Sequence, residues 1–265
     1  METIVKPHLS PSSIDTYLKC GEQFRRRYIL GERIPPGIAI LKGKSVHGAA
    51  EVNFKQKIAS RKDLKVSDMV QAAAASFEKS VSDGLQFTPE EESEGKANVL
   101  GKVKDRSIVL TQLFAASVAP QYQPALVEEK VVIEMPHSPF DLLGYIDMAD
   151  DKDRIMDLKT TGKSKTQDEA DQSNQLTYYA AAYQIKTGRK PSSVRLDVLV
   201  DKKTPEHQQI ETGRDFPDFE RLAAKVDMVA KGIKAEVFLP PPPGSWACSQ
   251  KFCGYWSTCK IRNGR

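Results

Sequence analysis

The chain has 265 residues, of which 40% are hydrophobic and 28% are charged, and its formal net charge at pH 7 is +4. This length and composition allow a full hydrophobic core in one large domain or two small ones. The sequence contains no apolar run long enough to cross a bilayer, and its first seven residues lack the apolar stretch of a secretory signal. We therefore expect a cytoplasmic protein without membrane contact.

The first 120 residues are predicted to be mainly helical. Ser10 followed by Pro11 is typical of a helix start, because serine caps the first turn and proline suits its first position. Apolar residues at roughly helical spacing extend this segment to Tyr28, with a weak point at Gly21. A loop is expected at 31–36, and further helices are expected at 44–58, 66–82 and 90–117.

The pattern changes at Pro120. Strands are predicted at 127–135, 140–148 and 154–159, and a charged turn at 150–153 joins the last two. A helix near 171–187, strands at 194–200 and 206–212, and a helix at 216–234 complete the predicted order. We expect one α/β domain over 1–265, with a mainly helical part at 9–120 and a part built of a sheet and helices at 121–239.

The four cysteines are placed at the two ends of the chain. Cys20 stands alone, whereas Cys248, Cys253 and Cys259 lie close together. In a reducing compartment such a group indicates metal binding sooner than disulfides, and four thiolates suit a tetrahedral metal ion or an iron–sulfur cluster. We predict one shared site at 20 and 248–259 that joins the two ends. The alternatives are four unrelated thiols, or a zinc site made by the C-terminal cysteines alone.

Two aspartates and a lysine carry the strongest catalytic signal. Side chains alternate along a strand, so Asp157 and Lys159 share one face. If the hairpin turns near residue 152, Asp147 lies opposite Asp157 with the Cβ atoms roughly 5 Å apart. Carboxylates that close repel unless a cation lies between them, and Mg²⁺ or Mn²⁺ suits such oxygen ligands. The alternative is a solvent-facing strand edge with ordinary charges.

Two helical pairs add polar candidates. His47 and Glu51 are four residues apart and share a helix face, as do Gln175 and Tyr179 on the helix that follows the Asp157 strand. Each pair taken alone is more typical of ordinary helix packing than of a functional site.

Taken together, His47, Asp147, Asp157-Leu-Lys159 and Gln175-Leu-Thr-Tyr-Tyr179 resemble the RecB-type branch of the PD-(D/E)XK nuclease superfamily. The flanking cysteines resemble those of the subset that carries a [4Fe–4S] cluster: the CRISPR-adaptation nucleases, the AddB nuclease domain and eukaryotic exonuclease V. The segment 9–24, Leu-Ser-Pro-Ser-Ser-Ile-Asp-Thr-Tyr-Leu-Lys-Cys-Gly-Glu-Gln-Phe, is similar to the first-cysteine helix of that subset. The resemblance extends from about residue 9 to residue 260.

The resemblance implies a restriction-endonuclease-like fold, which is a mixed central sheet flanked by helices, preceded here by an N-terminal helical region. It implies that His47, Asp147, Asp157 and the Leu158 carbonyl bind Mg²⁺ or Mn²⁺, and that Lys159 is the catalytic lysine. Gln175 and Tyr179 would position water or a substrate phosphate. The four cysteines would hold the cluster, with zinc as the alternative. Gly21 stands where the family commonly has proline, and four residues separate Cys248 from Cys253 where two are more usual.

We therefore predict a metal-dependent DNA nuclease, most simply an exonuclease acting on single strands or duplex ends, in the form of a stand-alone phage or bacterial enzyme. Residues 1–65 carry 13 Lys or Arg against six Asp or Glu, and Arg25, Arg26 and Arg27 are the predicted contacts to DNA phosphates. One alternative is a catalytically silent module that holds DNA or a partner in a recombination or CRISPR-adaptation complex. Another is a zinc-stapled enzyme that acts on a substrate other than nucleic acid.

Overall fold

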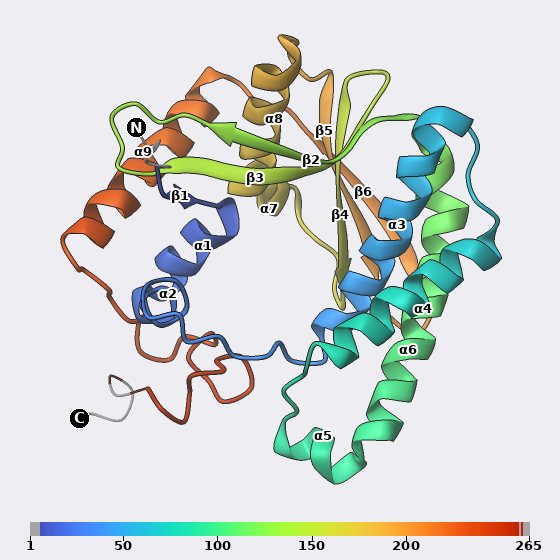
Figure 1. Cartoon of the computed structure of the whole chain (residues 1–265), viewed down its shortest axis with the longest axis horizontal. Coiled ribbons are helices and arrows are strands. Elements are labelled where there is room, and N and C mark those ends of the chain that lie inside the picture. The colour runs from blue at the N-terminus through green and yellow to red at the C-terminus, as the bar shows by residue number, and fades with distance from the viewer. Residues whose placement is uncertain (1–5, 260, 262–265) are drawn as a thin grey trace, which may run out of the picture. The chain divides into compact units, whose positions relative to one another are not determined.

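The computed structural model describes residues 6–259 and residue 261 (Figure 1). The chain divides into two compact units. Unit 1 comprises the described residues within 1–34, 132–144 and 215–265, and unit 2 comprises 35–131 and 145–214. The expectation of a single nuclease domain stays a prediction. Within the described residues, no helix is both long and apolar enough to span a membrane.

The described strands form one mixed, six-stranded sheet in the order β1-β3-β4-β5-β6, and β2 pairs with β3. The pairs β1–β3 and β4–β5 are parallel, whereas β3–β4 and β5–β6 are antiparallel. The strands are β1 (His8–Leu9), β2 (Pro124–Ile133), β3 (Asp141–Asp150), β4 (Arg154–Thr161), β5 (Ser193–Val200) and β6 (Glu206–Thr212). The predicted strands are all present, and the short β1 is the one that the sequence pattern missed.

Helices cover both faces of the sheet in unit 2. Figure 1 shows α3, α4 and α6 on one side of strands β4–β6, and α7 and α8 on the other. The helical elements are α3 (Ile40–Ser60), α4 (Val66–Ser82), α5 (Pro89–Glu94), α6 (Lys96–Leu113), the short turns η2 (Phe114–Val118) and η3 (Ala119–Gln121), α7 (Gln167–Asp171) and α8 (Asn174–Thr187). This mixed α/β architecture confirms the predicted fold class.

The core of unit 2 fixes α3 against β3 and β4. Ala50 and Phe54 of this helix belong to one buried apolar cluster with Met156 of β4. Gly48 lies on the side of α3 that meets α4, where an added Cβ would come within 2.6 Å of the Ser76 side chain. This close approach and the apolar cluster hold the first half of α3, which carries His47, in a fixed place beside the strands.

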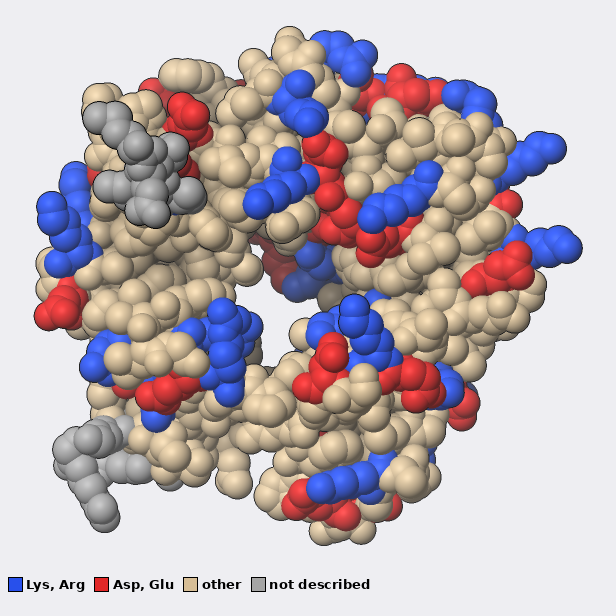
Figure 2. All heavy atoms as spheres, viewed as in Figure 1, with Lys and Arg blue, Asp and Glu red and all other residues tan. Residues whose placement is uncertain are grey.

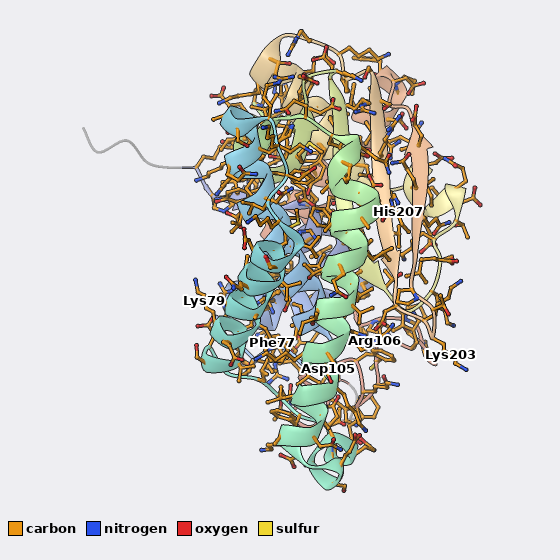
Figure 3. The ribbon with its side chains drawn as sticks, turned by 90° about the vertical axis from the view of Figure 1, so that its right-hand side faces the viewer. Phe77, Lys79, Asp105, Arg106, Lys203 and His207 are labelled. Atoms are coloured by element: carbon orange, nitrogen blue, oxygen red, sulfur yellow. The ribbon has the colours of Figure 1, made fainter. Side chains whose placement is uncertain are left out.

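An ion-pair group ties α6 to the end of β5. Arg106, labelled on α6 in Figure 3, donates from Nε to Oδ1 of Asp201 over 2.7 Å and from a second nitrogen to the Lys202 carbonyl over 2.8 Å. Lys42 of α3 pairs with the same aspartate. Burial raises the pKa of Asp201, but the two cations outweigh burial and hold it below its usual value. The long helices are thereby anchored to the sheet.

In unit 1, two short helices meet the polypeptide that follows α9. The elements are α1 (Pro11–Lys19), α2 (Gly21–Phe24), the π-helical turn η1 (Arg25–Ile29) and α9 (Phe216–Lys234). Ser10 caps α1 as predicted, because its Oγ accepts from the Ser13 amide at 3.1 Å. The Gly21 amide donates to the Leu239 carbonyl over 2.7 Å, and an added Cβ would lie 2.7 Å from backbone atoms of 238–239. The close approach therefore requires glycine, and proline would lack the amide donor.

Candidate active site

The two predicted aspartates meet across the β3–β4 hairpin. Met148 pairs with Met156 and Ala149 with Ile155, and the same antiparallel register sets Asp147 across from Asp157. The hairpin predicted from the sequence is thereby confirmed. Asp157 is 1% exposed, and the Asp147 side chain is 15% exposed. Two carboxylates therefore share a site that is largely closed to solvent.

A chain of hydrogen bonds links these carboxylates through Lys159 and helix α8. The Lys159 ammonium donates to Oδ1 of Asp157 at 2.9 Å and to Oε1 of Gln175 at 2.7 Å. The amide nitrogen of Gln175 donates to the Tyr179 hydroxyl at 2.8 Å, and this hydroxyl donates to Oδ1 of Asp147 at 2.5 Å. Each member is held by its neighbours, so the lysine and both carboxylates have fixed orientations.

The sequence explains why α8 supplies two side chains, Gln175 and Tyr179, to this series of hydrogen bonds. Ser173 caps the helix by accepting from the Leu176 amide, which sets where the first turn begins. Gln175 and Tyr179 then lie one turn apart on the same face. Tyr179 is 2% exposed, so this face is buried. Met156 and Leu158 belong to the apolar cluster beneath α3, as strand alternation requires when Asp157 and Lys159 face α8.

His47 approaches the pair of strands from α3. Its Nε2 lies 2.7 Å from the Leu158 carbonyl oxygen, and its Nδ1 lies 3.9 Å from Oδ2 of Asp147. The Leu158 amide donates to the same Oδ2 over 3.3 Å. The imidazole, the carbonyl and the carboxylate predicted to bind metal are thus brought together.

Burial and like charge shift the pKa values of the site. Burial, with repulsion from Asp147, raises the pKa of Asp157 to about 7, although Lys159 opposes the shift. Burial lowers the pKa of Lys159, but the carboxylates of Asp157 and Asp147 outweigh it and leave that pKa above its usual value. Burial and the same carboxylates raise the pKa of Tyr179 well above its usual value. At neutral pH, Lys159 is the cation of the site and Tyr179 is a neutral donor.

Two further glutamates border the site, and Glu128 was not predicted. Glu128 lies in β2 with φ +51, a left-handed conformation that is uncommon outside glycine. With Glu51, His47 and Asp147 it lines a hollow of about 10 Å³, about the room that one water-sized particle needs. Burial and the charges of Asp147 and Glu51 raise the pKa of Glu128 to about 7. Figure 2 shows acidic side chains gathered where α3 and β4 lie in Figure 1.

The chemistry of this donor set fits a divalent cation. Carboxylates, a carbonyl and an imidazole are ligands that Mg²⁺ and Mn²⁺ accept. Within 6–259 and 261, no three His, Cys, Asp or Glu side chains are already grouped as a metal site. Asp157 accepts a hydrogen bond from Lys159, and His47 contacts the Leu158 carbonyl. A bound cation would replace these contacts. Burial, followed by the neighbouring carboxylates, raises the pKa values of Asp157 and Glu128, so a cation bound among these groups would favour their charged forms.

In unit 1, all four cysteines line one cavity of about 400 Å³. Each is a free, half-buried thiol. Burial raises the pKa of the Cys20 and Cys253 thiols, and the charges of neighbouring thiolates add to the effect. A bound metal would be needed to hold them as thiolates at neutral pH. The structure thus brings Cys20 together with the three C-terminal cysteines, as the predicted shared site requires. The species bound there stays a prediction.

The three predicted DNA-binding arginines differ in their surroundings. Arg26 is held inside unit 1: it pairs with Glu32 at 2.8 Å, donates to Oγ1 of Thr258 at 2.9 Å and lines the cysteine cavity. The Arg25 side chain is 41% exposed and pairs with Glu22 over 3.5 Å. The Arg27 guanidinium lies over the Tyr28 ring, 5.6 Å from its centroid. Their role in DNA binding stays a prediction, and Arg26 is the least available of the three.

Comparison with known proteins identifies the class. The family model of the PD-(D/E)XK nuclease superfamily matches residues 8–260, so the chain belongs to this superfamily. A crystal structure of a candidate exonuclease from Eubacterium rectale superposes with a TM-score of 0.53 and 12% identity, covering 98% of this chain and 89% of that one. A second structure, of SSO0001, has a TM-score of only 0.35 and 17% identity over 64% of this chain and 78% of that one. No curated protein matches the sequence.

Proposed function

We propose that the protein is a divalent-metal-dependent DNA exonuclease of the RecB-type branch, with a [4Fe–4S] cluster held by Cys20, Cys248, Cys253 and Cys259. The observation that carries the proposal is the hydrogen-bonded chain from Asp157 through Lys159, Gln175 and Tyr179 to Asp147. Such a fixed arrangement of a lysine with one buried and one half-buried carboxylate is costly for stability, which supports a catalytic role.

His47, Asp147, Asp157 and the Leu158 carbonyl would hold the cation, and Glu128 and Glu51 line the small hollow beside His47 and Asp147. A bound cation would neutralise phosphate charge and lower the pKa of a bound water. Lys159 directs its ammonium group into the same site, where it can orient water or stabilise negative charge on the phosphate. Gln175 and Tyr179 are positioning residues, because they contact Lys159 and Asp147.

The cluster part of the proposal is supported by the cysteine cavity. A zinc ion and a [4Fe–4S] cluster can each be held by four thiolates. The four thiols border one cavity of about 400 Å³, so one bound group could contact all of them. The choice of the cluster over zinc rests on the resemblance of the flanking cysteines. An absorbance band near 400 nm and matching iron content would test it; colourless protein with stoichiometric zinc would contradict it.

The proposed exonuclease activity is tested with three DNA substrates: 5′-labelled linear single strands, 5′-labelled linear duplex, and a covalently closed circular single strand. With Mg²⁺ or Mn²⁺ we expect short products from a linear substrate and an intact circle, and EDTA should stop the reaction. The E. rectale relative is itself named a candidate exonuclease. Cleavage of the circle at the same rate as linear DNA would indicate an endonuclease. Absence of cleavage with either metal would favour the catalytically silent binding module.

A further inference from the structure

Two aromatic side chains stand on the surface of unit 1 and contact each other. Trp246 is 66% exposed and Phe252 is 55% exposed. Their ring centroids are 5.2 Å apart and their planes are perpendicular. Large aromatic side chains are normally withdrawn from water, so a paired and exposed tryptophan and phenylalanine suggest that the surface binds something.

The pair is held in place by the turns around it. Oγ of Ser249 donates to the Trp246 carbonyl at 2.8 Å. The Ser249 carbonyl accepts from the amides of Phe252 at 3.1 Å and Cys253 at 2.8 Å. The two rings are therefore presented by a hydrogen-bonded segment, which reduces the conformational entropy lost when a ligand stacks on them.

The charge of the segment that carries the pair favours a polyanion. Residues 237–265 include no Asp or Glu, and Lys251 is the cation of this segment that the structure describes. The ammonium group of Lys251, next in sequence to Phe252, lies 5.5 Å from the centroid of its ring. An exposed aromatic surface beside a cation in an acid-free segment is the combination that binds single-stranded nucleic acid, in which unpaired bases stack and phosphates pair with the cations.

We propose that Trp246, Phe252 and Lys251 form a binding site for single-stranded DNA, in which an unpaired base stacks on the aromatic pair and Lys251 contacts a neighbouring phosphate. This rests on the proposed function for its choice of DNA. The base faces of a duplex are already stacked on each other, so the site should prefer single strands. It lies outside the catalytic residues and adds affinity for unpaired DNA to their chemistry.

The test measures binding without cleavage. A fluorescently labelled oligothymidine of about 16 nucleotides, which spans the usual site size, and a duplex of equal length are titrated in EDTA, with anisotropy as the readout. Trp246→Ala and Phe252→Ala should each weaken oligothymidine binding by roughly fivefold or more. Trp246→Phe should retain most of the affinity. Lys251→Ala should reduce the slope of log affinity against log salt concentration by about one.

Phe216→Ala is the matched control, because Phe216 is 70% exposed in the same unit and stands between the acidic residues Asp215 and Asp218. Its binding should equal that of the wild type. Unchanged oligothymidine affinity in both alanine variants would overturn the proposal, as would an equal loss for duplex. A change in oligomeric state in place of DNA affinity would assign the surface to protein contact. Because EDTA excludes catalysis, the result does not depend on whether the protein cleaves DNA.

Discussion

Replacing Asp157 with asparagine should stabilise the metal-free protein at alkaline pH, although it should abolish activity. Folding raises the pKa of this carboxyl from 3.8 to about 7. The folded state therefore binds the proton more tightly than the unfolded state, and the stability that the proton brings is lost as pH rises from about 4 through 7. At 1.36 kcal/mol per pKa unit, the loss at pH 8 is about 4 kcal/mol.

The raised pKa already includes the attraction of Lys159 for the carboxylate, and an asparagine Oδ1 can still accept from the Lys159 ammonium. The net expectation is a gain of about 3–4 kcal/mol at pH 8, or roughly 6–16 °C in Tm. Thermal unfolding in EDTA, followed by circular dichroism at pH 5 and pH 8, measures the difference. At pH 5 the gain should fall to about 1–2 kcal/mol. A variant that is less stable than wild type at pH 8, or a difference that does not change with pH, would refute the argument that burial strains this carboxylate.

Three further outcomes follow from the same structure. Cys20→Ser should lower both the iron content and the stability of the protein. A cluster shared with the C-terminal cysteines closes a long loop, which stabilises the folded state by about 4–5 kcal/mol. Full metal occupancy and an unchanged Tm would exclude a site shared between Cys20 and the C-terminal cysteines. Replacing Arg25 and Arg27 together with glutamine should weaken DNA binding and lower its salt slope by about two, and an unchanged slope would place the DNA elsewhere. Gly21→Ala should cost about 1–3 kcal/mol in chemical denaturation, because its Cβ would meet backbone atoms of 238–239; a neutral effect would contradict that close approach.

The sequence predicted those parts of the fold that local patterns determine. Helix and strand periodicity placed nearly every element, and the β3–β4 hairpin followed from a charged turn between two apolar runs. The expected helix at 90–117 is interrupted at Gly95, which has φ +92. The two-residue strand β1 was missed because so short a segment has no periodicity, and its pairing with β3 is a contact between distant residues.

The candidate site was predictable where residues follow one another at strand or helix spacing. Asp157 and Lys159 share a strand face, and Gln175 and Tyr179 share a helix face. Glu128 was not predictable, because its position depends on a positive φ within β2. The sequence pattern around a residue other than glycine does not indicate such a φ. The contacts of Arg26 could not be predicted from the sequence either, since its partner Thr258 lies 232 residues further along the chain.

The proposed activity depends most on Asp157, and a matched aspartate on the adjacent strand provides the control. Asp197 is 0% exposed and hydrogen-bonded to Tyr122, and its register opposite Leu158 sets it on the other face of the sheet. The decisive measurement is the cleavage rate of end-labelled DNA with saturating Mn²⁺ for wild type, Asp157→Asn and Asp197→Asn, each checked for folding by circular dichroism. We expect a loss of about 10²–10³-fold for Asp157→Asn, the size seen when one stabilising group of an active site is removed, and near wild-type cleavage for Asp197→Asn. Cleavage by purified Asp157→Asn at the wild-type rate would contradict it.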